Sequence, residues 1–185
     1  MSGAVVPREP HPLADLFPVL EGEALDALAN DIRHHGLRVP ITLFEEKILD
    51  GRNRYAACLR AGVEPRFEPW RGEGSPLAWV VSVNLHRRHL SESQRAIVGA
   101  RAKALFEAEA KGRQIAGGRS KVPASLPEAG EARAHAAKLV NVSPRSIEDG
   151  SCVIGKGAPE LVRAVETGEM AVSQAAKIAA DQKGR

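Results

Sequence analysis

The chain has few cysteines and no long run of apolar residues, and each shortage excludes a class of protein. Its two cysteines, Cys58 and Cys152, lie far apart and have no partner at the spacing of a cysteine or histidine metal site. We interpret both as reduced thiols, which predicts a cytoplasmic protein. No apolar run approaches the roughly 18–20 residues that cross a bilayer, and the N-terminus lacks the apolar core of a signal peptide. We therefore expect no membrane partner.

Aromatic side chains are also scarce. They make up 4% of the chain, so we expect no platform on which nucleic-acid bases stack. What the sequence does contain is 43% hydrophobic and 26% charged residues. Over a length of 185 residues, this composition predicts a folded protein of one domain or two small ones.

Charge is unevenly divided between the two halves. Residues 1–90 carry 11 Lys and Arg against 12 Asp and Glu, a net charge of −1, whereas residues 91–185 carry 15 against 11, a net charge of +4. Residues 111–121 contain four basic side chains and no acidic one. The C-terminal half is therefore favoured as a nucleic-acid face. A solvated basic linker is the alternative interpretation of residues 111–121.

The first half combines helical and strand patterns. The predicted elements, in order, are an extended proline-rich arm (1–18), a helix ending at Gly36 (23–35), a hairpin of two short strands (39–44 and 47–49), a helix ending at Gly62 (54–61) and a broken strand (63–70). Glu45 and Glu46 form the predicted hairpin turn.

The second half predicts helices. Ser91 and Gln94 have the spacing of a capping box, which opens a long helix. The predicted helices are 77–85, 92–110, 131–139, 144–152, 158–166 and 172–180. We expect an α+β protein, in which a small mixed-sheet domain precedes an all-helical one. The expected parts are an arm (1–18), a mixed domain (19–110), a basic linker (111–130) and a helical domain (131–185).

One turn in the first half carries a strong chemical signal. Asp50-Gly51-Arg52-Asn53-Arg54 follows an apolar strand and opens an alanine-rich helix. The start of a helix presents unpaired N–H groups and the positive end of the helix dipole. Two arginines at this position predict a site for a phosphate-sized anion. An ordinary strand-to-helix corner with surface arginines is the alternative.

Three patterns give the chain a resemblance to the ParB/sulfiredoxin superfamily over about residues 20–110. They are His-Gly-Leu-x-x-Pro-Ile (35–41), Asp-Gly-x-x-Arg (50–54) and Asn-Leu-x-Arg (84–87), which occur in the family's order. In partition proteins of this family, the first glycine and arginine box binds the triphosphate of CTP. The second box supplies a metal-binding asparagine and a phosphate-binding arginine.

The resemblance implies a nucleoside triphosphate, CTP or ATP, with Mg²⁺ as cofactor. The residues it assigns to the phosphates are Gly51, Arg52, Asn53, Arg54, Arg87 and Arg88. Asn84 would face Mg²⁺. Asp50 and Glu23 are the candidate general bases near a bound phosphate. Trp70 and Trp79 are interpreted as core residues or as a wall beside the nucleotide.

Two residues depart from the family pattern. Arg52 stands where partition proteins carry a glutamate, and Val83 stands where they carry the glutamate linked to hydrolysis. Which nucleotide binds, and whether it is hydrolysed, therefore stays open. Sulfiredoxins place their reactive cysteine at the position of Arg52, whereas Cys58 lies further along the predicted helix. We therefore exclude sulfinic-acid reductase activity.

The second half contains a predicted helix-turn-helix. Alanines line one face of the first helix, and Ser143 with Pro144 gives a strong start to the second. The pattern resembles the helix-turn-helix of the same partition proteins and extends to about residue 180. The second helix of this motif enters the major groove by its N-terminal residues. The expected DNA-binding residues are Lys138, Ser143, Arg145, Ser146 and Lys156.

An opposing signal comes from the middle of that second helix. Glu148 and Asp149 are acidic for a recognition helix, and Gly150 and Gly155 predict a short or loose one. A helical packing module without DNA contact is therefore the alternative for this region.

Together these patterns favour a ParB-like DNA-binding protein of plasmid or phage type, with a homodimer as a candidate assembly. A nucleotide in the first half would control how the second half engages duplex DNA, in partition or regulation. One alternative is an enzyme of the same fold, a CTPase, an ATPase or a DNase (nuclease) acting on plasmid or transferred DNA, such as a fertility-inhibition factor of conjugation. The second alternative is an inactive scaffold.

Overall fold

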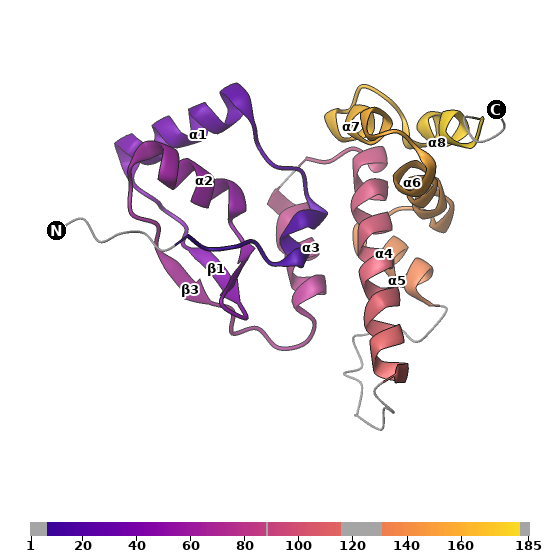
Figure 1. The fold of residues 1–185 in the computed structure, drawn as a ribbon, viewed down its shortest axis with the longest axis horizontal. Helices are drawn as coiled ribbons and strands as arrows, with labels where there is room; N and C mark the ends of the chain where they lie inside the picture. Colours follow the sequence, from indigo (N-terminus) through magenta and orange to yellow (C-terminus); the bar gives the residue numbers. More distant parts are fainter. Residues whose placement is uncertain (1–6, 88, 116–130, 182–185) are drawn as a thin grey trace. The chain divides into compact units, whose positions relative to one another are not determined.

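The computed structural model describes residues 7–87, 89–115 and 131–181. The chain forms two compact units, of which the first ends at Glu73 and the second begins at Gly74. The first contains both helices and strands, and the second is helical throughout its described residues (Figure 1). The expected α+β class is confirmed.

The first unit is built around a three-stranded mixed sheet. Its elements are the 3₁₀ helix η1 (Pro12–Leu16), α1 (Gly22–His35), β1 (Ile41–Phe44), β2 (Lys47–Asp50), α2 (Arg52–Ala61) and β3 (Phe67–Pro69). The strand order is β2-β1-β3, with β1 antiparallel to β2 and parallel to β3. The α1 and α2 helices pack against each other (Figure 1).

Apolar residues from both helices and the sheet form one core. The helical spacing predicted for α1 buries Ala29 and Ile32. These side chains meet Ile41 and Ile48 of the sheet and Cys58 of α2. Gly36 ends α1 in a positive-φ conformation (φ 74°), as its position predicts. This core holds the strand-to-helix corner of β2 and α2 in place.

The N-terminal arm differs from its prediction. Residues 1–6 lie outside the described residues. The Ile48 N–H donates to the Glu9 carbonyl and the His11 N–H to the Ile48 carbonyl, both at 2.9 Å, so the arm covers the outer edge of β2. The chain then turns into η1 because Pro12 starts a helix readily and the His11 side chain caps it. The prolines therefore mark a short helix as well as an extended segment.

The second unit is arranged around one long helix. Its elements are α3 (Pro76–Arg87), α4 (Glu92–Ile115), α5 (Ala132–Val140), α6 (Pro144–Lys156), α7 (Pro159–Thr167) and α8 (Val172–Asp181). The α5, α6, α7 and α8 helices all contact α4 (Figure 1). The predicted capping box is confirmed, because the Ser91 N–H donates to Gln94 Oε1 at 2.9 Å and the Gln94 N–H donates to Ser91 Oγ at 3.3 Å.

Two glycines bring α4 and α6 into close contact. A Cβ atom on Gly150 would lie 2.8 Å from the Ala96 carbonyl oxygen, and one on Gly99 would lie 2.4 Å from Ile147 Cδ1. Gly150 is therefore a packing residue of a helix that runs the full Pro144–Lys156. The prediction that the glycines shorten α6 was wrong, because the contact with α4 outweighs the low helix propensity of glycine.

The compact units divide the chain at a different point from the expected domains. We expected the mixed domain to continue to residue 110, whereas α3 and α4 belong to the second unit. The predicted linker at 111–130 begins inside α4, which continues to Ile115, and residues 116–130 lie outside the described residues. No helix in the described part of the chain combines the length and apolarity needed to cross a membrane.

Candidate functional site

The predicted phosphate turn lies where β2 ends and α2 begins. Gly51 is the N-cap of α2 and adopts a left-handed conformation, with φ 100° and ψ 19°. A Cβ atom there would lie 2.8 Å from Arg54 Nη2. The backbone conformation favours glycine, because a φ of 100° is one that other residues rarely adopt. The guanidinium of Arg54 therefore lies directly against the backbone of the turn.

Arg54 is held in this place by two neighbours. Its Nη2 donates to the Asp50 carboxylate at 3.1 Å and to the Pro40 carbonyl at 3.0 Å. The Arg54 side chain is 19% exposed and that of Asp50 is 9% exposed, so the ion pair is largely shielded from water. The Nε–H of Arg54 is buried and has no hydrogen-bond partner among the described residues. Within this part of the chain, that donor of Arg54 is unused.

The other two side chains of the turn hold the segment before α1. Arg52 forms an ion pair with Asp15 and donates to the Phe17 carbonyl at 2.8 Å. The Asn53 Oδ1 accepts from the Leu20 N–H at 3.1 Å. Both contacts join residues more than 30 positions apart in the sequence. Arg52 and Asn53 therefore fasten the turn to the segment that follows η1.

Cys58 lies one helical turn beyond Arg54 and is fully buried. Burial raises the pKa of the Cys58 thiol above the ordinary value of 9.0, and the nearby Arg54 charge offsets this only in part. The thiol is therefore protonated and shielded, which is the opposite of what a nucleophilic cysteine requires.

The second predicted box lies in the other unit. Asn84 is buried in α3, and its Nδ2 donates to the Val80 carbonyl at 3.0 Å. Arg87 is the last residue of α3, and Arg88 lies outside the described residues. The residues assigned to one nucleotide site therefore come from two separate compact units.

The two candidate general bases have different surroundings. Asp50 is buried and paired with Arg54, whereas Glu23 is exposed in the first turn of α1. Among the described residues, no group of three or more His, Cys, Asp or Glu side chains could hold a metal ion.

The predicted helix-turn-helix has the expected local geometry. Asn141 ends α5 in a left-handed conformation, with φ 52° and ψ 59°, which reverses the chain within three residues. Ser143 then caps α6, its Oγ accepting from the Ser146 N–H at 3.0 Å. Ala136 of α5 and Ile147 of α6 are fully buried. The capping and packing predicted from the sequence are confirmed.

The predicted DNA-binding residues lie along the exposed side of this motif. Lys138, Ser143, Arg145 and Lys156 are exposed, and Ser146 is half-buried. The Arg145 side chain is 84% exposed, and its Nε lies 3.2 Å from an Asp149 carboxylate oxygen. Ser146 Oγ donates to Glu92 Oε1 at 3.2 Å. The structure therefore brings basic and acidic side chains together at the start of α6.

Sequence reasoning missed Arg133, which extends this surface from α5. It forms an ion pair with Glu148 at 3.1 Å, and both side chains are about half exposed. Both acidic residues of α6 thus have an arginine partner within the motif. These two carboxylates do not by themselves make α6 repel a phosphate, because an arginine balances the charge of each.

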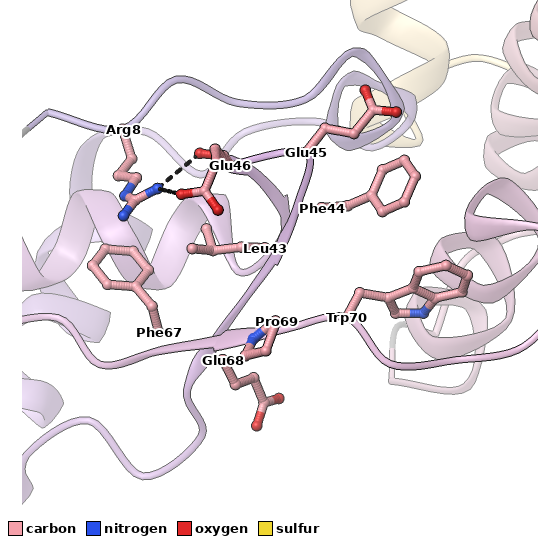
Figure 2. A pocket seen from close by; sticks show the side chains of 9 residues that line it. All are labelled: Arg8, Leu43, Phe44, Glu45, Glu46, Phe67, Glu68, Pro69 and Trp70. Carbon is pink, nitrogen blue, oxygen red and sulfur yellow. Dashed lines mark hydrogen bonds and ion pairs between the residues drawn. The ribbon is translucent and has the colours of Figure 1, made fainter.

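Sequence reasoning also missed a pocket in the first unit. This open pocket of about 420 Å³ is lined by residues of the arm, β1, the β1–β2 turn, β3 and the residue after β3 (Figure 2). Its members are Arg8, Leu43, Phe44, Glu45, Glu46, Phe67, Glu68, Pro69 and Trp70. Of these, only Trp70 was considered beside the predicted nucleotide. The signal that could have revealed this pocket is the two-residue hairpin turn made of two glutamates, because such turns usually contain glycine or asparagine.

Comparison with known proteins gives one likeness to report. No protein-family model matches the chain, and no curated protein matches it. Among solved structures, the chain is similar to the C-terminally truncated chromosome-partitioning protein ParB from Caulobacter crescentus, complexed with CTP-γ-S. The two are 19% identical, and the alignment covers 88% of this chain and 82% of that one with a TM-score of 0.33. At this score the likeness decides neither fold nor function, which depend on the residues described above.

Proposed function

We propose that this chain is a ParB-like DNA-binding protein in which a nucleotide bound at the β2–α2 turn controls how the helical unit engages duplex DNA. The observation that carries the proposal is the helix-turn-helix formed by α5 and α6. Its turn, cap and buried contacts are all in place. Partition or regulation of a plasmid- or phage-type element is the role that such a protein performs.

The exposed start of α6 supports DNA binding. The N-terminal residues of a recognition helix reach base edges, and flanking cations contact phosphates. Arg145 is accessible, because its side chain is 84% exposed and its ion pair with Asp149 can open at little cost. Lys138 and Lys156 are also exposed and are the proposed phosphate contacts.

The geometry of the turn supports nucleotide binding. A phosphate oxygen could accept from the buried Arg54 Nε–H, for which the described residues supply no partner. An incoming phosphate would compete with the Asp50 carboxylate for the same guanidinium. When bound, Mg²⁺ would offset the charge of the triphosphate, and Asn84 is the candidate ligand.

A nucleotide can control DNA binding only if it favours one state of the protein over another. By linkage, DNA must then change nucleotide affinity by the same factor as nucleotide changes DNA affinity.

The nucleotide proposal is tested by calorimetric titration of the full chain with CTP and with ATP, each with Mg²⁺. Arg54→Lys keeps the charge beside Asp50 but loses the planar guanidinium, so we expect nucleotide affinity to fall about tenfold. Arg60→Lys, on the same helix and paired with Asp26 at the surface, is the matched control and should bind as the parent does. Equal nucleotide affinity of the two variants would show that Arg54 does not bind the nucleotide.

The DNA proposal is tested by selection from a pool of random-sequence duplexes, followed by titration of the selected duplex. Affinity should fall steeply with salt because phosphate contacts release counterions. Arg145→Ala should weaken binding to the selected duplex, whereas Arg163→Ala, an exposed arginine of α7, should not. Repeating the titration with CTP or ATP shows whether the nucleotide shifts DNA affinity. An unshifted affinity would contradict the switch.

A further inference from the structure

The pocket at the β1–β2 turn is distinct from both proposed sites and has its own chemistry. Aromatic rings and carboxylates both line it (Figure 2). Glu45, Glu46 and Glu68 supply three carboxylates, and Arg8 supplies the one cation. In a chain whose net charge is +3, this is a locally acidic cavity. Its electrostatics favour a cation and disfavour a phosphate or a carboxylate.

The backbone fixes the two turn carboxylates at the rim. Glu45 and Glu46 have φ values of 50° and 61°, so both occupy the left-handed region that side chains other than glycine rarely adopt. A two-residue turn between antiparallel strands requires this conformation at both positions. The Glu46 side chain is 87% exposed, so its carboxylate lies at the mouth of the pocket.

Arg8 shows how a guanidinium fits this place. Its Nη1 donates to the Glu46 carboxylate at 2.7 Å and to the Glu46 carbonyl at 3.0 Å, and its Cζ lies 5.4 Å from the centre of the Phe67 ring. The group is therefore held by an ion pair, a carbonyl and an aromatic face at once (Figure 2). Lysine could form the ion pair, but only a planar guanidinium suits all three contacts.

We propose that this pocket is a binding site for an arginine side chain of a partner polypeptide, and that Arg8 pairs with its Glu46 carboxylate until the partner arrives. Three features support an external occupant. Arg8 lines the open pocket, whose volume of about 420 Å³ leaves space for a second side chain. Glu45, which lies 3.7 Å from His11, and Glu68, which accepts from the Thr42 hydroxyl at 3.3 Å, also line it, so the lining carries three carboxylates and one arginine. Phe44 and Trp70 add aromatic surface, with ring centres 5.4 Å apart at 89°.

Arg8 also belongs to the arm that covers the edge of β2. Its N–H donates to the Tyr55 hydroxyl at 3.0 Å, and the neighbouring Glu9 pairs with Ile48. Displacing the Arg8 side chain leaves these backbone contacts available to hold the arm. A competing arginine can therefore enter without unfolding the sheet edge.

The test is an NMR titration of the full ¹⁵N-labelled chain with the peptide acetyl-Gly-Gly-Arg-Gly-Gly-amide. We expect saturable shifts of the amides of residues 43–46 and 67–70. The same peptide with citrulline, which keeps the shape and loses the charge, should not bind. Arg8→Gln removes the internal competitor, so we expect the arginine peptide to bind about fivefold more tightly. Unchanged or weaker binding by this variant would overturn the proposal.

A second pair of variants separates recognition from folding. Arg8→Gln with Glu46→Gln should lose the affinity gained by Arg8→Gln alone, because the ligand loses its carboxylate while glutamine keeps the size of the side chain. Arg8→Gln with Glu64→Gln, an exposed glutamate of the same unit outside the pocket, is the matched control and should keep that affinity. Equal binding by the two double variants would refute recognition by Glu46. Shifts of the same amides by CMP, without shifts by the arginine peptide, would instead identify a nucleotide pocket and refute the proposal.

Discussion

Arg54 in the first unit and Arg145 in the second both lie in the first turn of a helix, and each pairs with an aspartate four residues away. The surroundings of the two arginines differ. The Arg54 side chain is 19% exposed and Asp50 is 9% exposed, whereas Arg145 is 84% exposed and its partner Asp149 is 15% exposed. An ion pair in which both side chains are shielded from water is costly to break by removing one partner, whereas water can replace an arginine that is itself exposed. Arg54 therefore supports the fold, and Arg145 is available to a ligand.

The largest effect should follow from removing the shielded charge. Arg54→Ala deprives the buried Asp50 carboxylate of its guanidinium, so we expect a loss of about 3 kcal/mol in the free energy of unfolding of the first unit. Hydrogen exchange of the α2 amides, compared with those of α6, measures this loss separately from the second unit. Adding Asp50→Asn to Arg54→Ala should recover part of it. Arg60→Ala removes an exposed pair from the same helix and should cost less than about 1 kcal/mol.

The next effect tests the packing that supports Arg145. Gly150→Ala places a methyl group 2.8 Å from the Ala96 carbonyl oxygen, so α6 must move away from α4. We expect a loss of about 2 kcal/mol in the stability of the second unit, measured by urea denaturation and by exchange of the α6 amides. Gly155→Ala is the matched control on the same helix. Among the described residues beyond its own helical backbone, no heavy atom lies within 4 Å of the added methyl group, so alanine should stabilise α6 by up to about 1 kcal/mol.

A smaller effect should appear in how the stability of the first unit depends on pH. Because burial raises the pKa of Cys58 in the folded state, the unfolded thiol ionises at lower pH than the folded one. The stability of the first unit should be insensitive to this group below the ordinary thiol pKa of 9.0 and should fall as pH rises above it. Cys58→Ala should reduce that alkaline loss, measured by denaturation at pH 8 and pH 10.

In the folded protein, the partly exposed Cys152 should react with a thiol reagent before Cys58. The reverse order would contradict the assigned environments.

The smallest effect on stability should come from Arg145→Ala. Its side chain is 84% exposed, so water can solvate the Asp149 carboxylate in its place, and the free energy of unfolding should change by less than about 1 kcal/mol. Any loss of DNA affinity in this variant would then reflect a lost contact with DNA. A large loss of stability would instead make Arg145 a folding residue like Arg54 and remove the contrast between them.

Local signals in the sequence predicted much of the fold. The capping box of Ser91 and Gln94, the start of α6 at Ser143 and the end of α1 at Gly36 depend on neighbours within a few residues, and the structure confirms each. Gly150 was misread because its role depends on Ala96, which lies 54 positions earlier in the sequence. Propensity describes a helix alone and does not record what packs against it.

The candidate site was harder to predict, because its contacts also join residues that lie far apart in the sequence. The sequence places Gly51 and Arg54 at a helix start, which the structure confirms. It does not reveal that Arg52 pairs with Asp15 or that Asn53 binds the Leu20 N–H, because these are long-range contacts. The pocket around Phe67 brings together three separate segments and has no periodic pattern along the chain.

The close packing of α4 and α6 has a mechanical consequence. Gly150 of α6 lies against the Ala96 carbonyl of α4, and Ile147 of α6 fills the space over Gly99 of α4, so α6 cannot slide or rotate without moving α4. With 24 residues, α4 is about 36 Å long. The α4 helix and the helix-turn-helix should therefore move as one rigid body, so that a rotation of α4 would also displace the start of α6.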